Sequence, residues 1–290
     1  MTVAIESDEN GGRQTDWSAW VGRREVSAEL ILPERVAALA ATLDLDETPR
    51  EGDRLPPGWH WLFFNPFVSR RDLGLDGHPK RGGFLPPVSL PRRMWAGGRI
   101  DYPAALAVGR PAERVSVIEK VESKTGGSGE LVFVTVKHHI ACDGVECVVE
   151  EQDIVYRGPS ASPAKAVQAP PDGEWRREVT PDATLLFRYS ALTSNGHRIH
   201  YDQAYAREEE GYPDLVVHGP LTATLLQNFA VEIRPQSRLT RFEFRGLQPI
   251  FVGGPFALEA TIGATPTTLA MWASGPRGEM AMRASAHFSA

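Results

Sequence analysis

The sequence is poor in cysteine and has no long hydrophobic run. Its 290 residues include 2 cysteines, Cys142 and Cys147, whose spacing matches no metal or redox motif, so we expect free buried thiols. No apolar run approaches the ~20 residues that a membrane span requires. The net charge of -6 argues against general binding to nucleic acid or to an anionic membrane. The acidic segment 1–12 lacks the basic and apolar regions of a signal peptide, so we expect a cytoplasmic protein.

Nucleotide and nucleophile motifs are also missing. No Gly-x-Gly-x-x-Gly opens a strand–helix unit, no Gly-Lys-Ser/Thr loop is present, and no Gly-x-Ser-x-Gly elbow occurs. The neighbours His138 and His139 lie in a strand pattern, which points their side chains to opposite faces and makes a poor metal site. We therefore expect no metal and no nucleotide cofactor.

The chain has the composition of a globular protein, with 42% hydrophobic and 23% charged residues. An aromatic and proline-rich stretch follows the first predicted helix. We expect helices at 36–43 and 222–230, and strands at 115–121, 131–137, 145–156, 239–245, 256–262, 268–272 and, less clearly, 281–286. A helix followed by antiparallel strands thus occurs twice, which predicts an α+β architecture.

The same pattern predicts two domains. We assign residues 1–157 to a first domain, of which 1–12 form a disordered tail. Residues 158–174 have the proline, serine and glycine content of a linker. Residues 175–290 form the second domain, which contains the motif that follows.

A short polar turn and a helix start carry the chemistry in this sequence. The turn reads Asn195-Gly-His197-Arg198-Ile-His200-Tyr-Asp202, and the helix start reads His218-Gly219-Pro220. Histidine exchanges protons near neutral pH, with an ordinary pKa of ~6.5. A helix N-terminus supplies backbone N–H donors to a developing oxyanion. Together these groups predict a site that polarises a carbonyl compound and transfers protons.

These residues resemble the signature of the MaoC-like family of hotdog-fold (R)-specific enoyl-thioester hydratases and dehydratases. That signature reads Asp-x-Asn-Pro-x-His, followed by a His-Gly-Met/Pro-Leu helix start. The variant found here is most similar to mitochondrial-type hydroxyacyl-thioester dehydratases and to bacterial mesaconyl-C4-CoA and itaconyl-CoA hydratases. The segment Leu90-Pro-Arg92-Arg93-Met-Trp95-Ala-Gly97-Gly98 also resembles the bacterial members.

The resemblance implies a double hotdog, in which two antiparallel sheets each wrap around a long helix. It also implies a hydratase that adds water to itaconyl-CoA or mesaconyl-C4-CoA, giving citramalyl-CoA. Coenzyme A is then part of the substrate, and no separate cofactor is expected. A (3R)-hydroxyacyl-thioester dehydratase of fatty acid synthesis and a non-catalytic acyl-CoA-binding protein remain as alternatives. Oligomeric state and the choice between CoA and acyl-carrier protein stay open, and a homo-oligomer is one option.

Residue roles follow from matching the signature. His200 takes the place of the catalytic histidine, and Gly219 that of the glycine whose N–H binds the thioester oxygen. Asn195 stands where the family has an aspartate, and an amide cannot exchange protons at neutral pH. The missing function then falls to His200 alone, or to His200 with help from Asp202 or His197. Asp202 alternatively caps a helical turn at 203–207.

Three arginines are candidates to bind the CoA phosphates or a distal substrate carboxylate. Arg198 ranks first, because the family has an uncharged proline at that spacing; Arg92 and Arg93 follow, with ordinary surface charge as the alternative. Trp95 and His218 are further substrate-binding candidates, with core packing as the alternative for Trp95. We expect one site per chain, built mainly from residues 185–230, with the first half supplying pocket walls.

Overall fold

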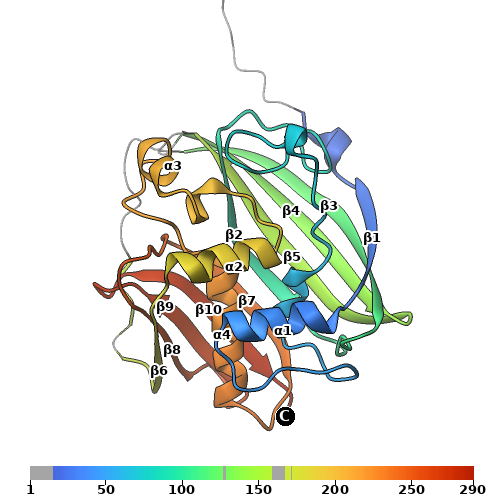
Figure 1. Cartoon of the computed structure of the whole chain (residues 1–290), viewed down its shortest axis with the longest axis vertical. Helices are drawn as coiled ribbons and strands as arrows, with labels where there is room; N and C mark the ends of the chain where they lie inside the picture. Colours follow the sequence, from blue (N-terminus) through green and yellow to red (C-terminus); the bar gives the residue numbers. More distant parts are fainter. Residues whose placement is uncertain (1–15, 127–128, 159–166, 171) are drawn as a thin grey trace, which may run out of the picture.

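The computed structural model describes residues 16–126, 129–158, 167–170 and 172–290. The predicted tail at 1–12 and part of the predicted linker lie outside these residues. The described chain forms one ten-stranded antiparallel sheet, and its helices gather on one face of that sheet (Figure 1).

The elements divide into two series along the chain. The first series is β1 (Arg24–Leu30), α1 (Pro33–Thr42), β2 (Arg92–Asp101), β3 (Pro111–Gly126), β4 (Gly129–Cys142) and β5 (Val145–Arg157). The second series is β6 (Trp175–Val179), α2 (Ala183–Leu192), α3 (Gln203–Glu208), α4 (Gly219–Ile233), β7 (Leu239–Gly246), β8 (Phe256–Ile262), β9 (Thr268–Ser274) and β10 (Met280–Phe288). The division of the chain into two domains at 157 and 175 stays a prediction.

Alternating side chains explain the strands. Along β4, Val132, Val134 and Val136 are buried, while the residues between them are partly exposed, as the two-residue period of a strand requires. His138 follows the buried series, and His139 lies on the exposed face and pairs with Glu146. The two histidines therefore point to opposite faces, as the sequence predicted.

Strand order reveals an internal repeat. The sheet runs β1-β3-β4-β5-β2-β7-β10-β9-β8-β6. Counted outward from the β2–β7 seam, both halves show the same order, in which the second strand of each series lies at the centre and the first at the edge. The α+β prediction is confirmed. The two expected sheets are in fact continuous, because β2 pairs with β7 from Gly97↔Arg245 to Asp101↔Arg241.

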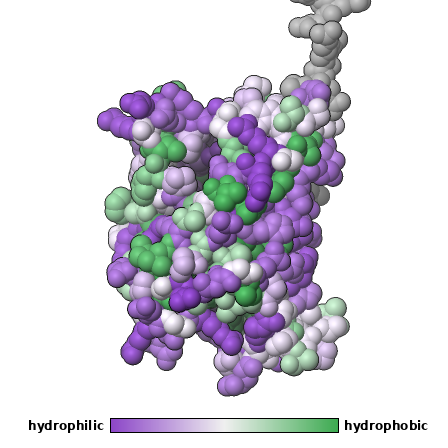
Figure 2. All heavy atoms as spheres, turned by 90° about the vertical axis from the view of Figure 1, so that its right-hand side faces the viewer, coloured by the Kyte–Doolittle hydropathy of each residue, from purple (hydrophilic) through white to green (hydrophobic). Residues whose placement is uncertain are grey.

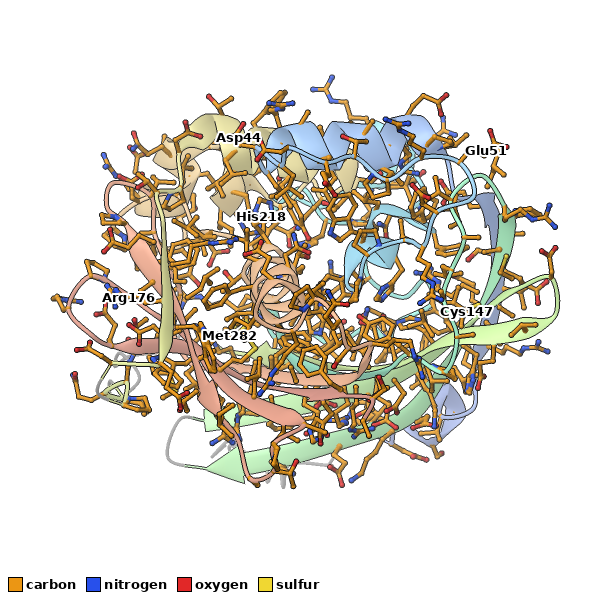
Figure 3. All side chains as sticks on the ribbon, turned by 90° about the horizontal axis from the view of Figure 1, so that it is seen from below. Asp44, Glu51, Cys147, Arg176, His218 and Met282 are labelled. Atoms are coloured by element: carbon orange, nitrogen blue, oxygen red, sulfur yellow. The ribbon has the colours of Figure 1, made fainter. Side chains whose placement is uncertain are left out.

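Helix α4 lies inside the curve of the sheet. Its residues are buried along nearly the whole length, as expected for a helix that is apolar on most of its surface. Helices α1 and α2 follow the first strands of their series, contact each other and form a further layer above α4 (Figure 3). The N-terminus of α4 is thereby enclosed between the helical layer and the sheet.

The first half differs from the expectation of a long helix in each sheet. Between α1 and β2 the described chain has only 3-10 turns, at Trp59–Leu62 and Arg70–Asp72. Pro56, Pro57 and Pro66 leave too short an uninterrupted stretch for a long helix. Aromatic side chains from this stretch fill the space and join the same core as α4.

Most predicted elements are present. Both predicted helices, the turn of helix at 203–207 and all seven predicted strands are confirmed. Strands β1, β2 and β6 were missed. Both edge strands are among these, and β1 has mostly exposed side chains, so neither has a clear apolar pattern.

The surface is predominantly polar on the side of β1, where apolar side chains form small separate patches (Figure 2). Charged side chains on an edge strand discourage pairing with another chain, and β1 carries Arg24, Glu25 and Glu29. Cys142 and Cys147 are free and buried, as predicted. Within the described residues, no helix is long and apolar enough to cross a membrane.

The β2–β7 seam depends on a glycine. A Cβ atom at Gly97 would lie 2.5 Å from the backbone oxygen of Phe244. We expect Gly97→Val to force the two halves of the sheet apart and to lower the free energy of unfolding by about 1–3 kcal/mol, the range for overpacking. Gly254→Ala, where a Cβ meets nothing within 4 Å, is the control. Urea unfolding measures both, and equal stabilities would show that the seam tolerates a side chain.

Candidate active site

His200 lies in a 3-10 turn at Arg198–His200 and is 7% exposed. Its Nδ1 is 2.7 Å from the backbone oxygen of Val216. Because a carbonyl only accepts hydrogen bonds, Nδ1 must carry the proton. The lone pair of His200 is therefore on Nε2, where it can accept a proton.

His218 lies against this ring. It is the N-cap residue of α4, and its imidazole stacks on that of His200 with centroids 3.7 Å apart and planes inclined by 18°. Its Nε2 is 2.8 Å from Oγ of Ser190 in α2. Figure 3 places His218 above α4, toward the helical layer. His218 therefore holds the ring of His200 in place, and its predicted contact with the substrate stays a prediction.

The rings of this site are held uncharged. Burial lowers the pKa of His200 to about 4, against a smaller opposing effect of its bond to Val216. Burial also lowers the pKa of His218 well below its ordinary value, and the positive charge of a protonated His200 or His197 would lower it further. At neutral pH His200 is consequently in the basic form that a proton acceptor requires.

Gly219 is the first residue of α4. The first N–H groups of a helix have no acceptor within the helix, and the positive end of the helix dipole favours a developing negative charge. A Cβ built at Gly219 would meet nothing within 4 Å. Space for a ligand atom therefore exists beside this backbone, as an oxyanion hole requires.

Asn195 shapes the turn. Its Oδ1 accepts a hydrogen bond from the backbone N–H of His197 at 3.0 Å, and among the described residues it makes no hydrogen bond to His200. Its Nδ2 has no hydrogen-bond partner in the described part of the chain, so the amide can donate to a bound water or carbonyl. A catalytic part for Asn195 stays a prediction.

Arg198 and Asp202 bind each other. Nη2 of Arg198 is 2.7 Å from Oδ2 of Asp202, while Oδ1 of Asp202 accepts from the N–H of Tyr205 and caps α3. The guanidinium of Arg198 also lies over the Tyr205 ring and donates to the oxygen of Leu75. The capping alternative for Asp202 is thus confirmed. These contacts weaken the case for Arg198 as the first choice to bind a substrate carboxylate.

A loop of the first half crosses this turn. The backbone N–H of Arg198 donates to the oxygen of Asp76 at 2.9 Å. Gly77 has a positive φ of 87°, and a Cβ there would lie 1.8 Å from the oxygen of Gly196. Only glycine permits this approach. The contact brings a segment distant in sequence onto the motif.

The loop adds two residues that the sequence analysis missed, Asp76 and His78. Nδ1 of His78 is 3.0 Å from Oδ2 of Asp76, and the ring of His78 lies 4.2 Å from that of His197. The ring of His197 in turn meets the ring of His200 at 5.5 Å, edge to face. Four imidazoles therefore adjoin one another in series. The Asp-Gly-His-Pro turn was the only local signal for this loop.

The segment around β2 contributes two other candidates. Arg92 pairs with Glu210, its Nε 3.4 Å from Oε2, and donates to the Glu210 backbone oxygen. Trp95 packs edge to face on Trp61 and Phe244, at 5.0 and 5.7 Å between centroids. Core packing, the alternative for Trp95, is what these contacts describe.

Arg93, by contrast, has no ion-pair partner among the residues that the structure describes. Its positive charge contributes to the lowered pKa of both His78 and His197, behind the larger effect of burial. Of the three arginines predicted to bind anions, Arg93 therefore combines an unpaired charge with closeness to the site.

One group in the described chain offers atoms of the types that bind a metal. Single ligand atoms of Asp76, His78 and His197 lie within 4.8 Å of one another. The hydrogen bond between Asp76 and His78 already occupies two of these side chains. The group is therefore a carboxylate–imidazole pair beside a third ring, and the expectation of no metal stays a prediction.

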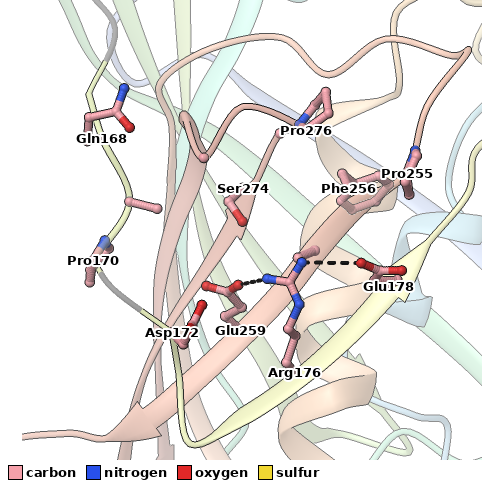
Figure 4. A pocket seen from close by; sticks show the side chains of 14 residues that line it. Gln168, Pro170, Asp172, Arg176, Glu178, Pro255, Phe256, Glu259, Ser274 and Pro276 are labelled. Atoms are coloured by element: carbon pink, nitrogen blue, oxygen red, sulfur yellow. Dashed lines mark hydrogen bonds and ion pairs between the residues drawn. The ribbon is translucent and has the colours of Figure 1, made fainter.

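Two cavities lie away from these residues. A cavity of about 300 Å³ lies beside β6 and β8, where Arg176 pairs with Glu178 and Glu259 (Figure 4). A second, of about 170 Å³, is lined by His60, Tyr102 and, in the last turn of α4, Val231. Neither contains a residue of the motif.

Comparison with known proteins places the chain among acyl-thioester enzymes. Residues 58–252 match the family described as hydroxyacyl-thioester dehydratase type 2. The chain is 45% identical over 273 residues to the mesaconyl-C(4)-CoA hydratase of Chloroflexus aurantiacus, covering 93% of this chain and 96% of that one. It is 28% identical over 235 residues to the mitochondrial hydroxyacyl-thioester dehydratase type 2 of Schizosaccharomyces pombe, covering 70% and 77%.

Solved structures agree on the fold. The HtdX protein of Mycobacterium tuberculosis aligns with a TM-score of 0.64 at 16% identity, covering 92% of this chain and all 100% of that one. Another protein of that organism, described as a double hotdog, aligns with a TM-score of 0.55 at 12% identity, covering 93% and 96%. The predicted double hotdog fold is confirmed.

The buried, uncharged state of His200 predicts a pH dependence of stability. Below pH 6.5 the unfolded chain binds a proton at His200, whereas the folded protein takes it up only near its pKa of about 4. Stability must therefore fall as the pH is lowered through this window. Each pKa unit corresponds to about 1.4 kcal/mol. Between neutral pH and pH 4, the free energy of unfolding of His200→Gln should therefore fall by roughly 3 kcal/mol less than that of the wild type.

Urea unfolding at several pH values between about 4 and 7 measures the effect. The control is His139→Gln, which replaces a histidine outside the motif; the loss of slope should be specific to His200→Gln. An unchanged slope in His200→Gln would mean that His200 is not the group that resists protonation.

Proposed function

The chain belongs to the hydroxyacyl-thioester dehydratase type 2 family, and on that premise we propose that it hydrates a short branched dicarboxylic enoyl-CoA. Its family makes it a hydro-lyase that acts on enoyl or hydroxyacyl thioesters. The proposed substrate is itaconyl-CoA or mesaconyl-C4-CoA, and the product is citramalyl-CoA. The observation that carries this choice is the 45% identity, over nearly the whole chain, to a mesaconyl-C(4)-CoA hydratase.

The carbonyl is polarised at the start of α4. As water attacks the β-carbon, negative charge moves to the thioester oxygen, which accepts a hydrogen bond from the N–H of Gly219. A donor that meets the oxyanion in this way contributes about 3 kcal/mol to lowering the barrier. The open space beside Gly219 supports this assignment.

His200 binds the attacking water. Its Nε2 carries the lone pair, because Nδ1 is bonded to the oxygen of Val216, and its lowered pKa keeps it in the basic form. Stacking on His218 fixes the plane of the ring. Such prearranged geometry is what makes a hydrogen-bond acceptor effective toward a single water molecule.

Arg93 binds the distal carboxylate of the acyl group. A buried carboxylate needs a partner, since an unpaired buried charge costs several kcal/mol. Arg198 and Arg92 already pair with Asp202 and Glu210. Arg93 acts on His78 and His197 through its charge and has no carboxylate partner among the described residues.

A (3R)-hydroxyacyl-thioester dehydratase of fatty acid synthesis is the second candidate, because the family and the Schizosaccharomyces pombe relative are named hydroxyacyl-thioester dehydratases. The non-catalytic alternative loses its ground, since the chain belongs to a family of hydro-lyases. The two remaining candidates differ in whether the acyl chain carries a charge at its far end.

A panel of three esters tests this proposal. The wild type should turn over itaconyl-CoA or mesaconyl-C4-CoA with a higher kcat/KM than crotonyl-CoA, which lacks the second carboxylate. His200→Ala should lower kcat by about 10²-fold or more, because the attacking water loses the acceptor that positions it, while the unfolding midpoint confirms an intact fold. A preference for crotonyl-CoA would favour the fatty-acid dehydratase.

Arg93→Met should separate the roles of the arginines. Losing a charge-assisted hydrogen bond worth about 1.5–3 kcal/mol corresponds to roughly a 10- to 100-fold lower kcat/KM for the dicarboxylic ester. Activity on crotonyl-CoA should change much less. The matched control, Arg92→Met, removes an arginine paired with Glu210 and should not change the ratio of the two activities. Equal losses on both esters in Arg93→Met would point to a CoA-phosphate or structural role.

A further inference from the structure

The site has more proton acceptors than the family signature supplies. Hydration moves one proton from water to the α-carbon, so a group must hold that proton between the two steps. Asn195 stands in the place of a carboxylate and cannot hold it. His200 has only the carbonyl of Val216 beside its Nδ1, and a carbonyl stabilises an imidazolium less than a carboxylate does.

The pair Asp76–His78 meets this need. Oδ2 of Asp76 accepts from Nδ1 of His78 at 3.0 Å, and Oδ1 accepts from the backbone N–H of His78 at 3.0 Å. The carboxylate thus fixes both the turn and the tautomer of the ring. With the proton on Nδ1, the lone pair of His78 is on Nε2.

Asp76 and His78 lie next to the motif turn in the folded protein, although they are distant from it in the sequence. Its loop is joined to the motif turn by the hydrogen bond from Arg198 to Asp76 and by the contact of Gly77 with Gly196. The ring of His78 adjoins that of His197, which adjoins His200. Asp76 is the one carboxylate that takes part in this series of rings among the described residues.

We propose that His78 is a second catalytic residue, which takes a proton from the attacking water and returns it to the α-carbon. Asp76 is its positioning residue, which also stabilises the charged ring through its negative charge. The inference rests on the proposed function only for the general reaction, the addition of water to an enoyl thioester, and not for the identity of the acyl group.

The step balances without an outside acid or base. The water donates one O–H to Nε2 of His200 and the other to Nε2 of His78. As its oxygen bonds to the β-carbon, one proton passes to His78, and the electron pair of the C=C moves toward the thioester oxygen at Gly219. The imidazolium of His78 then protonates the α-carbon. The hydroxyl keeps its second proton, and both rings are neutral again.

Charges around His78 set the pH at which this can occur. Burial lowers the pKa of His78, and the positive charges of Arg93 and Arg81 lower it further, while the hydrogen bond and the negative charge of Asp76 raise it. His197 is the neutral ring in contact with it. His78 is consequently neutral at pH 7 and able to accept a proton. The negative charge of Asp76 stabilises the protonated ring.

The test compares Asp76→Asn and His78→Ala with a matched pair elsewhere. An asparagine has one acceptor oxygen where the aspartate uses both of its oxygens. Asp76→Asn therefore loses one of the two hydrogen bonds as well as the charge, and it should lower kcat by about 10²-fold or more with little change in KM. The acid limb of the kcat/KM profile should also move to lower pH, because removing the carboxylate lowers the pKa of His78. His78→Ala should lose activity similarly and regain part of it with added imidazole.

The control pair is His139 and Glu146, an exposed histidine–carboxylate pair with 2.6 Å between Nδ1 and Oε1. His139→Ala and Glu146→Gln should leave kcat and the acid limb unchanged. Assays use whichever ester of the panel the wild type hydrates fastest, so a wrong acyl group would not affect this test. Nitrogen NMR of histidine-labelled protein gives a second readout, in which Asp76→Asn lowers the pKa of one ring without any substrate.

Three results would overturn the inference. The first is a folded Asp76→Asn enzyme with normal kcat and an unmoved acid limb. The second is a His78→Ala enzyme with near-normal kcat. The third is one bound zinc ion per chain with activity lost on chelation, since a metal would occupy the lone pair that the proposed step needs.

Discussion

The stack of His200 on His218 is the contact on which the rest of the site depends. It holds the ring of His200 between a neighbouring imidazole and the oxygen of Val216, away from water. His218 occupies this position because it is the N-cap residue of α4 and its Nε2 lies 2.8 Å from Oγ of Ser190 in α2. The position of the catalytic candidate therefore depends on one contact between helices. His218, at the start of α4, must lie against Ser190 of α2 with the uncharged ring of His200 stacked on it.

Burial of the two stacked rings keeps His200 uncharged at neutral pH, and it also lowers the stability of the protein. A buried imidazole resists protonation, which keeps His200 basic at neutral pH but lowers stability in acid. The buried Nδ1 of His218 finds no hydrogen-bond partner in the described residues, and an unpaired buried polar atom costs about 1–3 kcal/mol. Polar groups held at such cost are found at functional sites more often than in ordinary cores.

The two halves of the sheet repeat the same strand order but have diverged in the segment before their second strand. In the second half this segment forms α4 and provides the oxyanion donor. In the first half it forms the aromatic 3-10 turn at Trp59–Leu62 and the loop with Asp76 and His78. Trp59 binds Asn228 of α4 through its indole N–H. The first half thus supports the helix of the second and adds side chains to its site.

The sequence predicted those features of the structure that depend on interactions between neighbouring residues. The start of α4 at His218-Gly219-Pro220, the cap at Asp202 and the opposite faces of His138 and His139 each follow from a few neighbouring residues. The Arg198–Asp202 pair is also local, since the two residues lie four positions apart in the chain. The strands at the sheet edges lacked an alternating apolar pattern.

Long-range contacts were beyond this reasoning. The approach of Gly77 to Gly196 joins segments more than a hundred residues apart in the chain, and nothing in either glycine's neighbours indicates the other. For the same reason the sequence did not show that Gly97 permits β2 to pair with β7. A glycine in the sequence can indicate that another part of the chain packs closely against that position, but it does not indicate which part.

An amide at Asn195 is consistent with the separate roles proposed for His200, which binds the water, and His78, which takes the proton. Its Oδ1 makes the hydrogen bond to the N–H of His197 that shapes the turn, and an aspartate would make the same bond. A carboxylate at this position would, however, add a negative charge near His197 and His200 and raise their pKa values. The protein would then have two sets of rings competing for one proton. With an amide at 195, the geometry of the turn is kept, and the negative charge in the series of rings is that of Asp76, beside His78.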